Sequence, residues 1–171
     1  GLGDVYKRQT YGRVYKALID EGAETVMVGH IYQPAMTRKI NPSLQEKDML
    51  PGSTSKELVA GVLRGQLGFQ GLVVTDATPM VGFSMALSRA NALVAALNAG
   101  VDMLLFCKNM EEDIGSIREA LQDGRLSWKR VEEAVTRILA TKAHLGLPEK
   151  RKLGTLFPGN MSVLGCEKHQ A

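Results

Sequence analysis

Three short apolar segments, each followed by a stretch with helical periodicity, constrain the folds open to this chain. Residues 25–28, 72–75 and 102–106 fit β-strands, and the second of them, Leu72-Val73-Val74-Thr75, is apolar up to its last residue. Such a run is typical of a parallel strand covered by helices on both faces. The spacing of the strands is that of successive βα units. Three strands cannot close a barrel, so this α/β chain is either part of a (β/α)8 barrel or part of an open parallel sheet.

The spacing of apolar residues predicts helices between and after these strands. We expect them at residues 11–21, 54–67, 89–99, 110–122 and 127–144. Thr54-Ser55-Lys56-Glu57 fits a capping box, in which a hydroxyl and a carboxylate bond the free amides of a helix start. Gly100 should end the third helix, and Ser127 is the expected N-cap of the last. Residues 32–52 are expected to form a long polar loop.

The composition argues against several classes of partner. Hydrophobic residues make up 44% of the chain and charged residues 23%, which fits a globular domain and not a disordered one. The net charge of +3 is spread along the helices and only 5% of residues are aromatic, so we expect no nucleic-acid partner. No apolar run approaches the roughly 20 residues that span a bilayer. Cys107 and Cys166 lack the spacing of metal ligands, so we expect no metal and no cofactor. Free thiols favour a cytoplasmic location.

Both ends of the chain differ in character from its middle. Residues 1–9, GLGDVYKRQ, resemble the translation of a sequencing-library adapter, so we expect a non-native leader, with native sequence from about Thr10. An absent signal peptide then carries no information. After residue 147 the composition turns to Lys, Gly and Pro, and we interpret residues 148–171 as a linker that follows the domain.

The strand ends carry the candidate functional residues. In parallel α/β folds, functional groups gather where loops leave the carboxyl ends of the strands. Those positions hold His30, Asp76 and the group Phe106-Cys107-Lys108. A carboxylate directly after a buried strand is costly unless it is paired or hydrogen-bonded. From position alone, Asp76 could be either a functional group or the cap of the following turn.

The sequence around Asp76 resembles the nucleophile segment of glycoside hydrolase family 3. The resemblance begins with Leu67-Gly68-Phe69-Gln70-Gly71, runs through the strand to Asp76 and includes Met80. Further similar segments occur in the family's order, at residues 26–31, at 51–66 and at 96–104. The resemblance covers residues 10–147, and residues 163–167 are similar to the approach to the family's second domain.

The resemblance implies a fold and an activity. Residues 10–147 would be the C-terminal half of a TIM-like (β/α)8 barrel within a larger protein, and residues 148–171 would lead to a missing α/β-sandwich domain. Asp76 would be the nucleophile of a retaining β-glycosidase, which needs a second group roughly 5 Å away as general acid and base. In the family that group is a His-Asp pair upstream of Thr10 or a Glu in the second domain. We do not assign it to Glu46 or Asp48, the nearby carboxylates, so this chain alone should be inactive.

The resemblance also suggests the substrate and its contacts. The substrate would be a small carbohydrate with a terminal β-linked sugar, most simply a β-N-acetylhexosaminide, with a β-glucoside as the alternative. His30 could bond a sugar hydroxyl or only cap a turn, and Met80 could wall the sugar ring or only fill a gap in the core. Ala77 departs from the family, in which an acidic or aromatic residue often follows the nucleophile. Asp102 precedes a strand, so we expect it to make structural hydrogen bonds.

Two other classes of protein compete with this interpretation. Residues 73–82 also resemble the phosphoacceptor strand of a response-regulator receiver domain, in which Asp76 would take a phosphoryl group. That chemistry needs Mg²⁺ and carboxylates after an earlier strand, whereas His30 follows the earlier strand here. A Schiff-base aldolase would need a lysine at a strand end, and only Lys108 is placed there.

Overall fold

The computed structural model describes residues 11–147, and the chain divides after Ile138 into two compact units. The first unit holds the strands and the second begins inside the last helix. The predictions for residues 1–9 and 148–171 lie outside the described residues. The helices are α2 (Tyr11–Asp20), α3 (Pro34–Ile40), η1 (Glu46–Asp48), η2 (Gly52–Thr54), η3 (Glu57–Gln66), α4 (Val81–Ser84), α5 (Arg89–Ala99), α6 (Met110–Gln122) and α7 (Trp128–His144). None of them is both long and apolar enough to cross a membrane.

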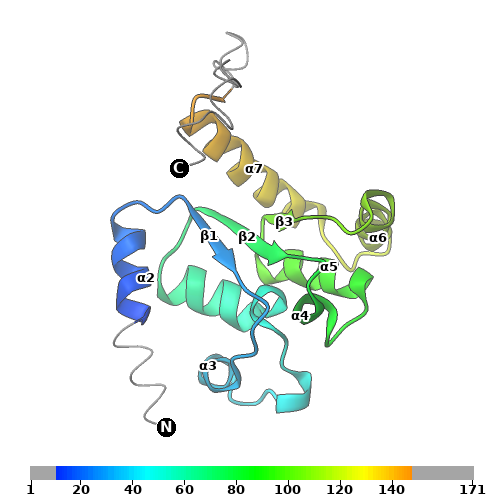
Figure 1. The fold of residues 1–171 in the computed structure, drawn as a ribbon, viewed down its shortest axis with the longest axis horizontal. Helices are drawn as coiled ribbons and strands as arrows, with labels where there is room; N and C mark the ends of the chain where they lie inside the picture. Colours follow the sequence, from blue (N-terminus) through cyan, green and yellow to red (C-terminus); the bar gives the residue numbers. More distant parts are fainter. Residues whose placement is uncertain (1–10, 148–171) are drawn as a thin grey trace, which may run out of the picture. The chain divides into compact units, whose positions relative to one another are not determined.

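The sheet is parallel, as predicted, and has the order β1-β2-β3 (Figure 1). Its strands are β1 (Thr25–Val28), β2 (Leu72–Ala77) and β3 (Met103–Leu105). Val26 lies opposite Val73 and Val28 opposite Thr75, while the register of β2 against β3 shifts between Val74 and Ala77. Because the strands are parallel, their carboxyl ends meet at one edge of the sheet. The fold is therefore mixed α/β with a small parallel sheet.

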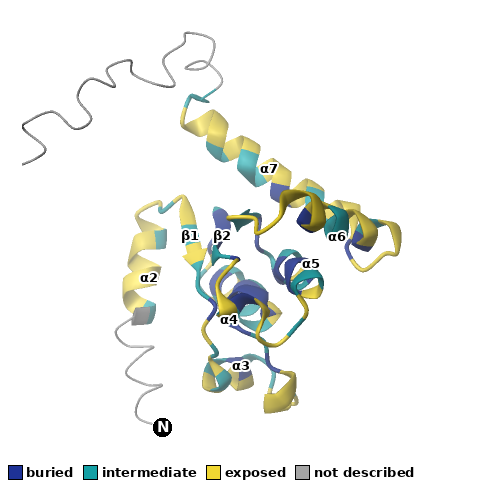
Figure 2. Ribbon diagram, turned by 45° about the vertical axis from the view of Figure 1, so that its right-hand side comes forward, coloured by how far each residue is buried: buried dark blue, intermediate teal, exposed yellow. Residues whose placement is uncertain are grey.

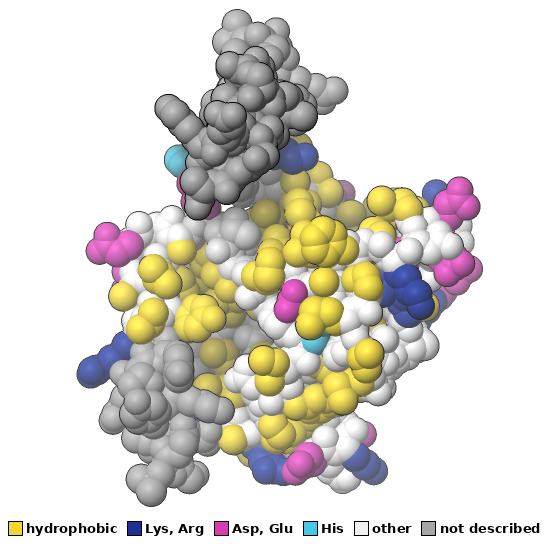
Figure 3. All heavy atoms as spheres, in the orientation of Figure 1, with side chains coloured by type: hydrophobic (Ala, Val, Ile, Leu, Met, Phe, Trp, Pro, Cys, Tyr) yellow, Lys and Arg dark blue, Asp and Glu magenta, His cyan; other side chains and the backbone are white. Residues whose placement is uncertain are grey.

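The core lies between β2 and the two helices η3 and α5. Val73 is fully buried and packs in one cluster with residues of both helices, whose buried members are Val59, Leu63, Ala92, Leu93, Ala96 and Ala99. Gly100 has a φ of 112° and ends α5, as predicted. Figure 2 shows the contrast between this buried centre and the exposed α2. On the face in Figure 3, hydrophobic side chains cover much of the surface.

The region between β1 and β2 differs from the sequence prediction. The expected polar loop contains α3 and two 3-10 turns. The helix after it, η3, is a π-helix, in which Leu67 donates its amide to the carbonyl of Val62. The predicted capping box is wrong. The Thr54 hydroxyl bonds the carbonyl of Pro51, whereas Ser55 accepts the Leu58 amide and its hydroxyl donates to Glu57. Helical periodicity predicted the helix but not its wider winding.

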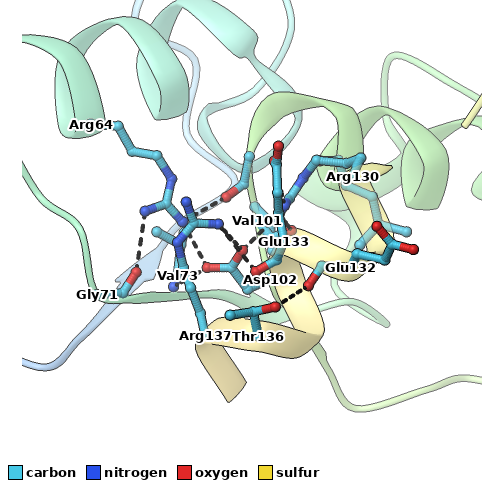
Figure 4. Close-up of polar contacts among 12 residues, drawn as sticks. Arg64, Gly71, Val73, Val101, Asp102, Arg130, Glu132, Glu133, Thr136 and Arg137 are labelled. Carbon is cyan, nitrogen blue, oxygen red and sulfur yellow. Dashed lines mark hydrogen bonds and ion pairs between the residues drawn. The ribbon is translucent and has the colours of Figure 1, made fainter. Parts of the chain in front are cut away.

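Asp102 joins the sheet to the two helices η3 and α7 through a buried ionic cluster of three arginines (Figure 4). Its fully buried carboxylate contacts Arg64 of η3 at 2.7 Å, and Arg130 and Arg137 of α7 at 2.7 and 3.2 Å. The same carboxylate accepts the backbone amide of Val73 at 3.0 Å. Burial lowers the pKa of Arg64, while Asp102 acts in the opposite direction. The predicted structural hydrogen bonds of Asp102 are confirmed.

Candidate active site

Asp76 lies at the carboxyl end of β2, next to the buried Thr75. Its side chain is partly exposed, and its Oδ1 accepts the backbone amide of Ala77 at 2.7 Å. Oδ2 has no hydrogen-bond partner within residues 11–147. One carboxylate oxygen is thus held against the turn, and the other makes no hydrogen bond in the described part of the chain.

His30 comes from the end of β1 and reaches the turn that follows Asp76. Its Nε2 lies 3.1 Å from the carbonyl oxygen of Ala77, and its Nδ1 lies 2.7 Å from Ser53 Oγ. A carbonyl only accepts hydrogen bonds, so Nε2 carries the proton in that contact, and a neutral ring then accepts the Ser53 hydroxyl at Nδ1. The ring also packs against Phe83, 5.1 Å between centroids. His30 is 8% exposed, and both of its nitrogens bond protein groups.

Met80 closes the same turn. Its amide donates to the carbonyl of Ala77 at 3.0 Å, and it precedes the short helix α4. The side chain is 48% exposed, so Met80 does not fill a gap in the core. Ala77 thus offers one carbonyl to both His30 and Met80, and the structure brings the three predicted site residues together around it.

A second set of residues, which sequence reasoning missed, holds the turn from the side of β3. Thr78 is buried, and its amide donates to the carbonyl of Leu105 at 2.9 Å. Arg89, the first residue of α5, donates to the carbonyl of Thr78 at 2.9 Å and lies 3.0 Å from its hydroxyl. The sequence contains one indication of this role, which is the positive charge of Arg89 at the start of a helix. A positive charge there is electrostatically unfavourable and requires a compensating partner.

That partner is Asp113 of α6. Arg89 binds it through two contacts, Nε to Oδ1 at 2.7 Å and Nη2 to Oδ2 at 2.6 Å. The hydrogen bond from Arg89 lowers the pKa of Asp113, and the same bond raises the pKa of Arg89. Both directions favour the charged forms.

The other candidate residues from the sequence either bond groups near them or make no hydrogen bond to the turn at residues 76–78. Glu46 pairs with Arg38 of α3, and Asp48 is exposed. Lys108 donates its backbone amide to Asp113 at 3.2 Å, and Cys107 is an exposed free thiol. Within the described residues, no group of His, Cys, Asp or Glu is arranged to hold a metal ion.

The family model for the glycosyl hydrolase family 3 N-terminal domain matches residues 7–141. The chain belongs to glycosyl hydrolase family 3. This membership confirms the resemblance seen around Asp76 and removes the receiver and aldolase alternatives.

Relatives of this family 3 chain have related but different names. A β-N-acetylglucosaminidase/β-glucosidase of Cellulomonas fimi is 46% identical over 164 residues, which is 95% of this chain and 28% of that protein. A solved structure named β-glucoside phosphorylase BglX is 49% identical with a TM-score of 0.81, over 83% of this chain and 26% of that one. The β-N-acetylglucosaminidase of Thermotoga maritima is 26% identical with a TM-score of 0.65, over 75% of this chain and 27% of that one. The chain thus spans about a quarter of the length of the relatives it matches.

Proposed function

We propose that this chain supplies the nucleophile-bearing, C-terminal half of a TIM-like barrel in a longer retaining β-glycosidase. The parallel sheet, the family match and the short span relative to its relatives support this architecture. In such a barrel the catalytic groups stand at the carboxyl ends of the strands, which is where Asp76 lies.

In the proposed mechanism, a carboxylate oxygen of Asp76 attacks the anomeric carbon of a β-linked sugar. The glycosidic bond breaks, and the leaving oxygen takes a proton from a general acid outside this chain. Water, deprotonated by the same group, then attacks the anomeric carbon and releases Asp76. The observation that carries the proposal is the partly exposed carboxylate with one oxygen fixed by the Ala77 amide.

His30 and Met80 have separate parts in this proposal. The two hydrogen bonds of His30 support a positioning role, in which its ring holds the Ala77 carbonyl behind Asp76. The exposed side chain of Met80 supports an apolar wall beside the sugar. We propose a β-N-acetylhexosaminide as the substrate, with a β-glucoside as the alternative, since the Cellulomonas relative is named for both activities.

The test uses the full-length protein, an aryl β-N-acetylglucosaminide and an aryl β-glucoside. We expect Asp76→Ala to abolish turnover of both, because the proposed covalent intermediate forms on the carboxylate that this variant lacks. As a matched control, removal of the exposed carboxylate in Asp48→Ala should leave turnover unchanged. A fluorinated glycoside trap should label Asp76, which mass spectrometry of peptides would locate. Labelling of another residue, or full turnover by Asp76→Ala, would remove Asp76 from the mechanism.

A second candidate reaction is phosphorolysis, favoured by the 49% identity to the structure named β-glucoside phosphorylase. In that reaction a phosphate oxygen, instead of water, attacks the anomeric carbon of the intermediate and the product is a sugar 1-phosphate. Turnover would be measured with and without inorganic phosphate, and products followed by ³¹P NMR. Free sugar at a rate independent of phosphate supports hydrolysis, and sugar 1-phosphate at a phosphate-dependent rate supports phosphorolysis. Asp76 is the nucleophile in both.

A further inference from the structure

The turn at residues 76–78 is fixed from two opposite sides. From β1, His30 bonds the carbonyl of Ala77. From the other side, the amide of Thr78 donates to Leu105 and its hydroxyl donates to the carbonyl of Phe106. Asp76 therefore sits on backbone that is attached to both neighbouring strands.

Phe106 shows how closely the end of β3 is fitted to this turn. It is the one residue other than glycine with a positive φ in the described part of the chain, at 56°. An aromatic residue persists in that region only when its surroundings hold it there. Its carbonyl accepts the Thr78 hydroxyl, so Thr78 connects the turn to a strained segment.

Arg89 adds two contacts to those that Thr78 makes with Leu105 and Phe106. A guanidinium is planar, and two contacts to one carboxylate fix its orientation. Asp113 makes both contacts, and the pair is well shielded, with side chains 21% and 5% exposed. The remaining hydrogen-bonding capacity of Arg89 is then directed at the carbonyl and hydroxyl of Thr78. A lysine could keep the charge but could not make both sets of contacts.

We propose that Arg89 is a positioning residue for the reaction at Asp76. Asp113 orients its guanidinium, the guanidinium fixes Thr78, and Thr78 fixes the carboxylate two residues earlier in the chain. Arg89 touches no reacting atom in this arrangement. The inference rests on the proposed role of Asp76 as nucleophile. Misplacement of a catalytic group by about 1 Å can lower the rate about 100-fold.

The experiment compares Arg89→Lys with a matched control, Arg130→Lys, in the full-length protein. Arg130 also pairs with a buried aspartate, Asp102, and its side chain is 12% exposed, but it contacts the start of β3 and not the turn. For Arg89→Lys we expect kcat and the rate of labelling by the fluorinated trap to fall about 10- to 100-fold, with KM little changed. Arg130→Lys should lower the thermal midpoint and leave kcat unchanged.

Two further variants keep the test decisive. Asp113→Asn should reproduce the loss of kcat, because it removes the negative charge and one of the two acceptors that orient the guanidinium. Thr78→Val keeps the Arg89–Asp113 pair and the bond from Arg89 to the Thr78 carbonyl but removes the hydroxyl, so we expect it to lower kcat less than Asp113→Asn does. Unchanged kcat in folded Asp113→Asn, or equal effects of Arg89→Lys and Arg130→Lys, would overturn the proposal. Labelling of the wild-type protein at a residue other than Asp76 would instead overturn the nucleophile assignment, before any variant is compared.

Discussion

At the scale of single residues, Asp102 illustrates what a buried charge requires. Its carboxylate is fully buried and faces Arg64, Arg130 and Arg137. One carboxylate therefore pairs with three guanidinium groups, and it also accepts a hydrogen bond from the backbone amide of Val73 in the middle strand of the sheet. Removing one member of a buried ionic network is costly because the remaining charges stay behind without compensation.

We expect Asp102→Asn to destabilise the full-length protein by about 3–5 kcal/mol, because three shielded guanidinium groups lose their counter-charge. Urea unfolding of the variant and the wild type measures this difference. Asp123→Asn is the control, since Asp123 pairs with Arg125 at an exposed site where water screens the charges, and its midpoint should hardly move. Equal midpoints for Asp102→Asn and the wild type would mean that the cluster does not contribute to stability.

The sequence predicted the candidate nucleophile but not the residues that hold it. Asp76 could be found because it follows an apolar run that only a buried strand explains. His30 could be found because it follows the other strand of a parallel pair. Arg89 and Asp113 lie 24 positions apart on two different helices. Their pairing depends on how α5 packs against α6, which hydrophobic periodicity does not specify.

At the scale of elements, the strands and the later helices follow from the sequence, and the segment between β1 and β2 does not. Arg89–Ala99 and Met110–Gln122 match their predicted bounds because Gly100 and Asn109 stop or start them by local hydrogen bonding. The π-helical winding of η3 has no such local signature, since its apolar spacing also fits an α-helix. The helix α3 was not predicted because the segment between β1 and η3 that contains it has a polar composition.

The contact between α5 and α6 should make stability depend on pH. The folded pKa of Asp113 lies below its ordinary value of 3.8, chiefly because of the hydrogen bond from Arg89. The stabilisation is therefore fully present above the unfolded pKa and is lost as the pH falls through the folded pKa. Urea midpoints measured from pH 6 downward should fall below about pH 4, and this fall should be smaller in Asp113→Asn.

Measurements at high salt distinguish the contribution of Asp113 to the pH dependence of stability from the contribution of exposed carboxylates. Arg125 also lowers the pKa of Asp123, but that pair is exposed and should be screened in 1 M salt. The shielded contribution of Asp113 should persist there. An acid profile of Asp113→Asn that coincides with the wild type at high salt would show that the Arg89–Asp113 pair does not couple stability to pH.

At the scale of the whole molecule, the first unit exposes the surfaces that an isolated sheet would use to associate. β1 and β3 each pair with β2 alone in the described part of the chain, so each has an open edge. Met27 of β1 is 52% exposed, and Val14 and Leu18 of α2 are exposed as well. Unpaired strand edges and apolar patches of this kind favour contact between chains, which fits the hydrophobic face in Figure 3.

We therefore expect this 171-residue chain, expressed alone, to self-associate, and we expect Met27→Lys to reduce that association. A lysine on an edge strand disfavours pairing with another strand because its charge would have to be buried. Gln122→Lys adds the same charge at an exposed site near the end of α6 and controls for net charge. Sedimentation velocity over a range of concentrations would show heavier species for the wild type and Gln122→Lys, and a shift toward monomer for Met27→Lys. A wild-type chain that is monomeric throughout, with a sharp and reversible unfolding transition, would contradict the prediction, because the open edges and exposed apolar side chains would then be tolerated in water.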